Sequence, residues 1–226
     1  MSVHGLGAIP SPPDDRDYEL EAQYTAEQLV SALPASFRVK NLPAVIYDQG
    51  QSPMCVAYSA ATEQASFDLV DTGHNYVWDF PYFFRKIGGT VHGAIIRNAL
   101  DWRLHRGYPL QPAGSGNSMA QHRIAAYYVV PRTRDGIKRA LVHYGVCLIG
   151  TDWFNSWFSP HADGTLPPPD YIVGGHAICV VGYDARGVWL RNTWGKDWGV
   201  KGECLMPWSY FLQIPREAWK AVDAAS

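Results

Sequence analysis

Apolar residues in the first half of the chain recur at helical spacing, whereas the second half contains short continuous apolar runs. Residues 55–69 contain no Gly or Pro, and their small apolar side chains share one helical face: Ala57, Ala60, Ala61, Ala65 and Leu69. A helix is therefore predicted here, ending before Asp71-Thr72-Gly73. The pattern predicts further helices at 25–31, 94–104 and 134–144.

The apolar runs of the second half predict β-strands at 127–130, 146–151, 176–184, 187–193 and 202–206. Long irregular loops separate several of them, notably at 153–175. A helix-rich half followed by a strand-rich half indicates an α+β chain with two unlike lobes.

The beginning of the chain differs from the rest because it is rich in Pro and acidic residues. Residues 1–30 are interpreted as an extended leader or short pro-segment, and residues 31–226 as a single domain. Within that domain we expect the helix-rich lobe at about 45–125 and the β-rich lobe at about 126–210.

Composition narrows the possible functions. The 226 residues are 47% hydrophobic and 13% aromatic, which excludes a disordered chain. The net charge of −2 lacks the basic footprint of a nucleic-acid binder, and no apolar run is long enough to span a membrane. The chain shows no signal peptide at its start, so we expect a cytoplasmic protein, with export by another route or association with a virion left open.

Metal and cofactor motifs are missing from the sequence. The four cysteines form no CxxC pair, and Cys147 and Cys179 lie in apolar runs where a free thiol packs as a small hydrophobe. HExxH, P-loop and GxGxxG patterns are absent. No metal and no cofactor are therefore predicted.

Cys55 follows the loop Gln49-Gly50-Gln51-Ser52-Pro53-Met54 and lies in the first turn of the predicted helix. Free backbone N–H groups at a helix N-terminus stabilise a thiolate, which is the reactive form of cysteine. A nucleophilic cysteine also needs a general acid, most often a histidine held by a third group.

His176 and Asn192 are candidates for these two roles. His176 follows Gly174-Gly175 at the start of a predicted apolar strand, and Asn192 lies near the end of the next strand. A turn at 184–187 can place the two side chains together. Asn is a neutral acceptor that fixes an imidazole tautomer without neutralising a thiolate–imidazolium pair.

Three strings around these residues resemble the papain-like cysteine peptidases. They are Gln49–Ala60 around the cysteine, Gly175–Tyr183 around the histidine, and Arg191-Asn192-Thr193-Trp194-Gly195-Lys196-Asp197-Trp198-Gly199 with Gly202. Their order also agrees with the family. The resemblance covers about four fifths of the chain and implies a two-lobe fold, with the nucleophile on a helical lobe, His and Asn on a β-barrel-like lobe, and the active site between them.

The resemblance implies a cysteine-type endopeptidase that acts on polypeptides through an acyl-enzyme. Cys55 would be the nucleophile, His176 the proton carrier, and Asn192 its orienting group. Gln49 would supply one oxyanion donor. A thiolate–imidazolium pair predicts a bell-shaped pH profile.

The resemblance also implies contacts to substrate. Trp194 would shield the His–Asn hydrogen bond, Trp198 would line the leaving-group side, and Gly88-Gly89 would meet the substrate backbone. A pocket for the second residue before the cut would be lined by Ile149, Gly175 and Ala177, and we expect it to prefer apolar side chains.

Departures from the family pattern concern the loop before Cys55 and the leader. Pro53 and Met54 add bulk beside the thiol, and the leader is far shorter than the pro-domain of secreted members. It is similar to the leaders of bacterial and phage members. We expect it to associate with the cleft or to be trimmed by self-cleavage.

Two other functions remain open at this stage. One is a papain-fold amidase or acyltransferase that acts on cell-wall peptides. The other is a catalytically inactive peptide-binding module, against which the joint presence of Gln49, Cys55, His176 and Asn192 argues.

Overall fold

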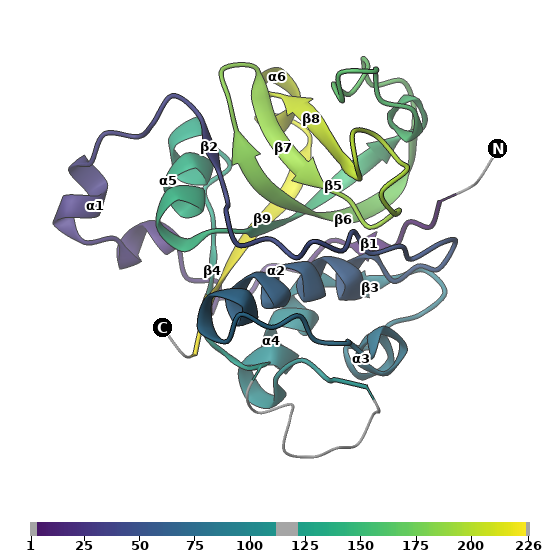
Figure 1. The fold of residues 1–226 in the computed structure, drawn as a ribbon, viewed down its shortest axis with the longest axis horizontal. Coiled ribbons are helices and arrows are strands. Elements are labelled where there is room, and N and C mark those ends of the chain that lie inside the picture. The colour runs from purple at the N-terminus through teal and green to yellow at the C-terminus, as the bar shows by residue number, and fades with distance from the viewer. Residues whose placement is uncertain (1–3, 112–121, 225–226) are drawn as a thin grey trace.

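A computed structural model describes residues 4–111 and 122–224 of the chain. Helices α2, α3 and α4 gather in one half of the molecule, and most strands of the large sheet lie in the other (Figure 1). This arrangement confirms the predicted α+β architecture with two unlike lobes. No helix within the described residues combines the length and the apolar character that a bilayer span requires.

Side chains cap the N-termini of three of the described helices, α1, α3 and α5. The helices are α1 (Ala26–Val30), α2 (Cys55–Asp71), α3 (Phe80–Lys86), α4 (Ile96–Arg106), α5 (Arg134–Tyr144) and α6 (Trp208–Phe211), with 3₁₀ turns η1 (Leu20–Gln23) and η3 (Asn155–Phe158). The Thr133 side chain caps the N-terminus of α5, and Gly145 follows its last residue at φ 85°. A threonine cap and a left-handed glycine fix both ends, so this helix has the bounds that the sequence predicts.

One antiparallel sheet contains most of the strands. Its order is β4-β9-β5-β6-β7-β8, and β2 pairs with β6 beside this path. The strands are β2 (Phe37–Arg38), β4 (Ile124–Val129), β5 (Cys147–Phe154), β6 (Ile172–Tyr183), β7 (Gly187–Arg191), β8 (Glu203–Pro207) and β9 (Pro215–Asp223). A separate parallel pair joins β1 (Ala8–Ile9) in the leader to β3 (Ala94–Ile95).

Helix α2 packs against β6 and is buried along most of its length. Ala57, Ala60 and Ala61 are fully buried, and their small side chains allow a close approach to the sheet. The Ser59 hydroxyl donates a hydrogen bond of 2.9 Å to the Ala177 carbonyl on β6. The helix start that carries Cys55 is therefore held against the strand that carries His176.

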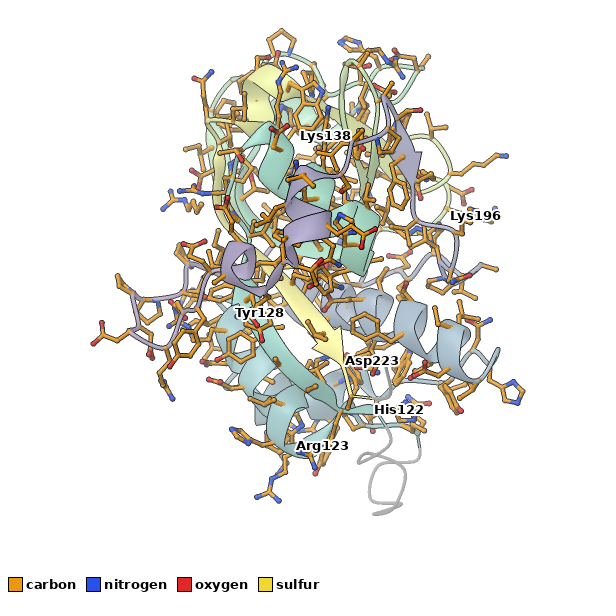
Figure 2. All side chains as sticks on the ribbon, turned by 90° about the vertical axis from the view of Figure 1, so that its left-hand side faces the viewer. His122, Arg123, Tyr128, Lys138, Lys196 and Asp223 are labelled. Atoms are coloured by element: carbon orange, nitrogen blue, oxygen red, sulfur yellow. The ribbon has the colours of Figure 1, made fainter. Side chains whose placement is uncertain are left out.

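A buried ionic cluster links α2, α4 and β9. The Glu63 carboxylate lies 2.7 Å from the Arg103 guanidinium and 3.1 Å from the Lys220 ammonium, and all three side chains are fully buried. Nearby, the His122 ring lies 3.0 Å from the Asp68 carboxylate. Figure 2 shows His122 beside Asp223 at the end of β9. Since removing one partner of a buried ion pair leaves an unpaired charge, this cluster favours one packing of the elements.

Three of the differences from the sequence prediction concern the site and the sheet around it. β6 begins at Ile172 rather than at residue 176, so His176 lies inside the strand. Helix α3 was not predicted, and neither was β9, which extends the sheet beyond residue 210. β9 contains the buried Lys220 among its apolar positions, which hides its strand pattern.

Candidate active site

Cys55 is the first residue of α2, and its side chain contacts β6. Its Sγ accepts a hydrogen bond of 3.4 Å from the backbone N–H of Ala177. Ala177 directly follows His176 in the chain. The fold therefore brings a thiol from the first half of the chain to the neighbour of a histidine from the second half.

His176 and Asn192 lie on adjacent segments of the sheet and form a hydrogen bond. The ring Nε2 lies 2.8 Å from Asn192 Oδ1, and both side chains are buried. Asn192 Oδ1 also accepts a hydrogen bond of 2.8 Å from the Thr193 N–H, which fixes the amide orientation. The imidazole is thus anchored through one nitrogen, while the buried Nδ1 has no hydrogen-bond partner within the described part of the chain.

Indole rings surround this histidine. The centroids of Trp194 and Trp153 each lie 4.8 Å from that of His176, and Trp198 lies 5.1 Å from Trp194. These rings exclude water from the His176–Asn192 hydrogen bond, which strengthens it. Trp194 and Trp198 were singled out in the sequence, but Trp153 was missed because it lies in the 153–175 segment that was interpreted as a loop.

Gln49 lies in the loop before α2 and is held by contacts on both ends of its amide. The Thr193 hydroxyl donates a hydrogen bond of 2.5 Å to its Oε1, which directs Nε2 toward the leader. Nε2 then donates to the carbonyls of Ser52 at 2.7 Å and Gly5 at 3.2 Å. The amide N–H group therefore binds a carbonyl oxygen of an extended peptide close to the Cys55 helix.

The leader crosses this site as an extended segment. The His4 ring stacks on Trp194 with centroids 4.7 Å apart and planes at 10°. Further on, the Gly7 N–H donates to the Gly175 carbonyl at 2.9 Å, and its carbonyl accepts from the Ala94 N–H at 2.9 Å. Residues 4–9 therefore contact Trp194, the strand that carries His176 and Ala94 of the helical lobe.

Gly93 is the glycine that approaches the leader backbone most closely. Its φ is 111°, and a Cβ at this position would overlap the backbone of Gly7. Gly88 and Gly89, which the sequence favoured for contact with the substrate backbone, lie against Asn98 and the Phe84 ring. Their contact with a substrate stays a prediction.

Burial determines the protonation of the site. It raises the pKa of the Cys55 thiol to about 12, although N–H groups of Ala177 and Val56 act in the opposite direction. Burial also lowers the pKa of His176 to about 4, against the effect of its hydrogen bond to Asn192. Both groups are therefore neutral at pH 7 in this covered state.

The expected thiolate–imidazolium pair is not formed in this conformation. No hydrogen bond joins the Cys55 sulfur to the His176 ring among the described contacts, and the sulfur is fully buried. The reason is burial, since an ion pair without access to water has a large desolvation cost. The sequence did not reveal that both groups are buried.

The residues predicted to contact a substrate lie in different surroundings. The Gly175 carbonyl binds the leader, and the Ala177 backbone N–H binds the Cys55 sulfur. Ile149 is fully buried in β5. Trp198 donates its indole N–H to the Phe158 carbonyl at 2.9 Å, at the rim of the tryptophan cluster.

Among the described residues, no group of three or more side chains is arranged to hold a metal ion.

The sequence model of the papain family of cysteine proteases matches residues 93–209, which is just over half of the chain. The chain belongs to the papain family of cysteine proteases. The match includes His176 and Asn192 and begins after Cys55.

Solved structures agree with this assignment at the level of the fold. The chain superimposes on xylellain, a cysteine protease from Xylella fastidiosa, with a TM-score of 0.84 at 23% identity, over 98% of this chain and 97% of that one. The procathepsin B S9 of Trypanosoma congolense gives a TM-score of 0.79 at 20% identity, over 98% and 87% of the two chains. The predicted papain-like two-lobe fold is confirmed.

Curated relatives match over shorter segments. Cysteine proteinase 2 of Entamoeba histolytica is 27% identical over 128 residues, which are 49% of this chain and 41% of that protein. The chain spans about two fifths or less of the length of the curated relatives it matches.

Proposed function

We propose that this protein is a cysteine peptidase that hydrolyses peptide bonds through an acyl-enzyme on Cys55. The observation that supports this most directly is the contact between the Cys55 sulfur and the backbone N–H next to His176. It brings the thiol and the anchored imidazole to one point of the groove. An extended peptide, the leader, already occupies that groove.

The proposed reaction begins when the leader leaves and water enters the groove. Solvation lowers the pKa of Cys55 and raises that of His176, so the thiol proton moves to the imidazole. The thiolate sulfur attacks the carbonyl carbon of the substrate. Gln49 Nε2 and the Cys55 backbone N–H donate to the oxyanion that develops.

His176 then donates its proton to the amine nitrogen, and the C–N bond breaks to leave a thioester on Cys55. In the second half of the reaction the neutral imidazole removes a proton from water, whose oxygen attacks the thioester carbon. The carbon–sulfur bond breaks, which releases the acid and restores the thiol. Asn192 keeps the ring in the orientation that both steps require.

We further propose that residues 4–9 keep the enzyme latent. The leader presents the Gly5 carbonyl to Gln49 and Trp194, which are donors beside the reaction centre. His4 lies by the tryptophan cluster, and Gly7 binds Gly175 and Ala94. An intact leader therefore excludes a substrate from the same donors and acceptors.

The experiment compares the full chain with its Gly5→Glu variant, because any Cβ at this position would overlap the Ser52 carbonyl. We expect Gly5→Glu to cleave peptidyl-coumarin substrates with a bell-shaped pH profile and to be modified at Cys55 by an epoxysuccinyl inhibitor. The double variant with Cys55→Ala should be inactive. Failure of folded Gly5→Glu to react at Cys55 would refute the peptidase.

Mass analysis of the purified chain beside Cys55→Ala tests whether the leader is also removed by self-cleavage. A shorter N-terminus that appears only in the chain with Cys55 would support trimming. An identical N-terminus in both proteins would exclude it and leave displacement as the route to the open groove.

A further inference from the structure

A hollow of about 520 Å³ lies between the end of α3 and one face of α4. Lys86 and Ile87 form its wall on the α3 side. The wall on α4 is a stripe of side chains at helical spacing, formed by Asn98, Asp101, Trp102, His105 and Arg106. The Asn98 side chain donates a hydrogen bond of 3.2 Å to the Ile87 carbonyl, so the two walls are joined.

This hollow lies outside the groove that the leader occupies. Helices α3 and α4 pack against α2 on the side that faces away from β6 (Figure 1). Within the described part of the chain, its walls contain no residue of the leader or of the strands that carry the candidate site. The half-buried ring of Trp102 lines the hollow, so an apolar surface is open to a ligand there.

The segment that builds this hollow is far more basic than the rest of the chain. The whole sequence has 19 Lys and Arg residues and 21 acidic ones, whereas residues 80–123 contain six Lys and Arg residues and one acidic residue, Asp101. Two of the six are neutralised inside the fold, Arg97 by Asp17 and Arg103 by Glu63. The other four side chains are exposed: Arg85, Lys86, Arg106 and Arg123.

The cations at the rim of the hollow exceed the negative charge beside them. Arg85, Lys86 and Arg106 form no ion pair within residues 4–111 and 122–224. The one carboxylate in the wall, that of Asp101, accepts a hydrogen bond of 2.6 Å from the Tyr127 hydroxyl. A ligand that supplies further carboxylates would therefore complement this surface.

We propose that this hollow is a docking site for an acidic segment of a partner protein. Carboxylates of the segment would pair with Lys86 and Arg106, and the apolar parts of its side chains would lie on Trp102. At about 1.5 Å per residue, the stripe from Asn98 to Arg106 is about 12 Å long, which matches about four residues of extended peptide. A nucleic acid fits less well, because a chain with a net charge of −2 lacks the continuous basic path that a phosphate backbone requires.

The test measures binding to the full-length Cys55→Ala chain, so its result does not depend on the proposed peptidase. The probe is a short fluorescein-labelled peptide of Glu and Leu, and its control is the same peptide with Gln in place of Glu. We expect fluorescence anisotropy to show saturable binding of the Glu peptide, and binding of the Gln peptide that is weaker by about tenfold or more.

Two pairs of charge reversals test the position of the site. Lys86→Glu with Arg106→Glu should weaken binding of the Glu peptide by about tenfold or more. Lys40→Glu with Lys196→Glu changes the net charge equally at exposed residues outside the hollow and should leave the Kd unchanged. Figure 2 shows Lys196 well apart from Arg123, which lies beside the end of α4.

Mapping decides the question without a variant, in case the reversed chain does not fold. A photo-crosslinking group on the Glu peptide should label α4 between Asn98 and Arg106. Crosslinks confined to the groove around position 55, or equal affinity for the two peptides, would overturn the proposal. Equally tight binding of a single-stranded oligonucleotide at this hollow would assign it to nucleic acid instead. A dimer of the full chain that dissociates in Lys86→Glu with Arg106→Glu would assign it to a second copy and also overturn the proposal.

Discussion

The Gly5→Glu substitution should displace the leader and increase the fraction of molecules in which Cys55 is exposed. The structure gives the size of this increase. Gly5 forms three hydrogen bonds. Its N–H donates to the Gly50 carbonyl at 2.8 Å, and its carbonyl accepts from the Gln49 side chain at 3.2 Å and from the Trp194 indole at 3.1 Å. The adjacent His4 ring stacks on Trp194. All four contacts require the backbone of residue 5 to lie against Ser52 without a side chain.

The size of the effect follows from these contacts. A net contribution of about 1 kcal/mol per hydrogen bond, with about 1 kcal/mol for the stacked rings, gives about 4 kcal/mol for this part of the leader. Since 1.4 kcal/mol corresponds to a factor of ten, the open fraction should rise by about 10³. The leader contacts at Gly7 remain in this variant, so we expect the open fraction to increase only for the segment around the Cys55 sulfur.

The assay is the rate at which a small thiol reagent modifies Cys55, followed by peptide mapping. The other three cysteines are also free and buried and serve as internal controls: Cys147, Cys179 and Cys204. We expect the Cys55 rate to rise by about 10³ in Gly5→Glu and to stay unchanged in Asp15→Ala, an exposed leader position. A simultaneous rise at all four cysteines would indicate unfolding. An unchanged Cys55 rate in folded Gly5→Glu would refute the covering role of the leader.

Three further predictions concern the oxyanion donor, acid and the buried ions. In the Gly5→Glu background, Gln49→Ala should lower kcat by about 10²–10³, measured with saturating substrate. In a Cys55→Ala chain, the fraction of molecules with the leader released should rise by up to about two orders of magnitude between about pH 6.5 and pH 4. The reason is that the covered state lowers the pKa of His176, so the open state binds the proton more readily. A rate of limited proteolysis of the leader that does not change over this pH range would contradict this prediction. Arg103→Ala should destabilise the fold by about 3–5 kcal/mol in urea titrations, because Glu63 loses a buried partner.

The candidate residues of the site could be proposed from the sequence because each lies beside a strong local signal. Cys55 lies at the start of a Gly-free and Pro-free helix, and Asn192 lies in an Asn-Thr-Trp-Gly string. His176 was found through its apolar strand, although the strand begins four residues earlier. These signals depend on neighbours in the chain, so they can be interpreted without knowledge of the fold.

The features that were missed depend on contacts between distant segments. Gly93 is defined by the approach of Gly7, which is far away in the sequence. The pairing of β9 with β5 was missed because β9 was obscured by the fully buried Lys220. The Lys220 ammonium is held by the Glu63 carboxylate at 3.1 Å and the Val146 carbonyl at 2.6 Å, which lie in other parts of the chain. No window of the sequence contains both partners of any of these contacts.

The leader cannot cover the site while Cys55 and His176 carry charges, and this incompatibility links the proposals. A dry groove holds Cys55 and His176 neutral, so the leader must leave before the reactive ion pair forms. A substrate competes with the leader for the carbonyl of Gly175, so the docking free energy of the leader raises the apparent KM and leaves kcat unchanged.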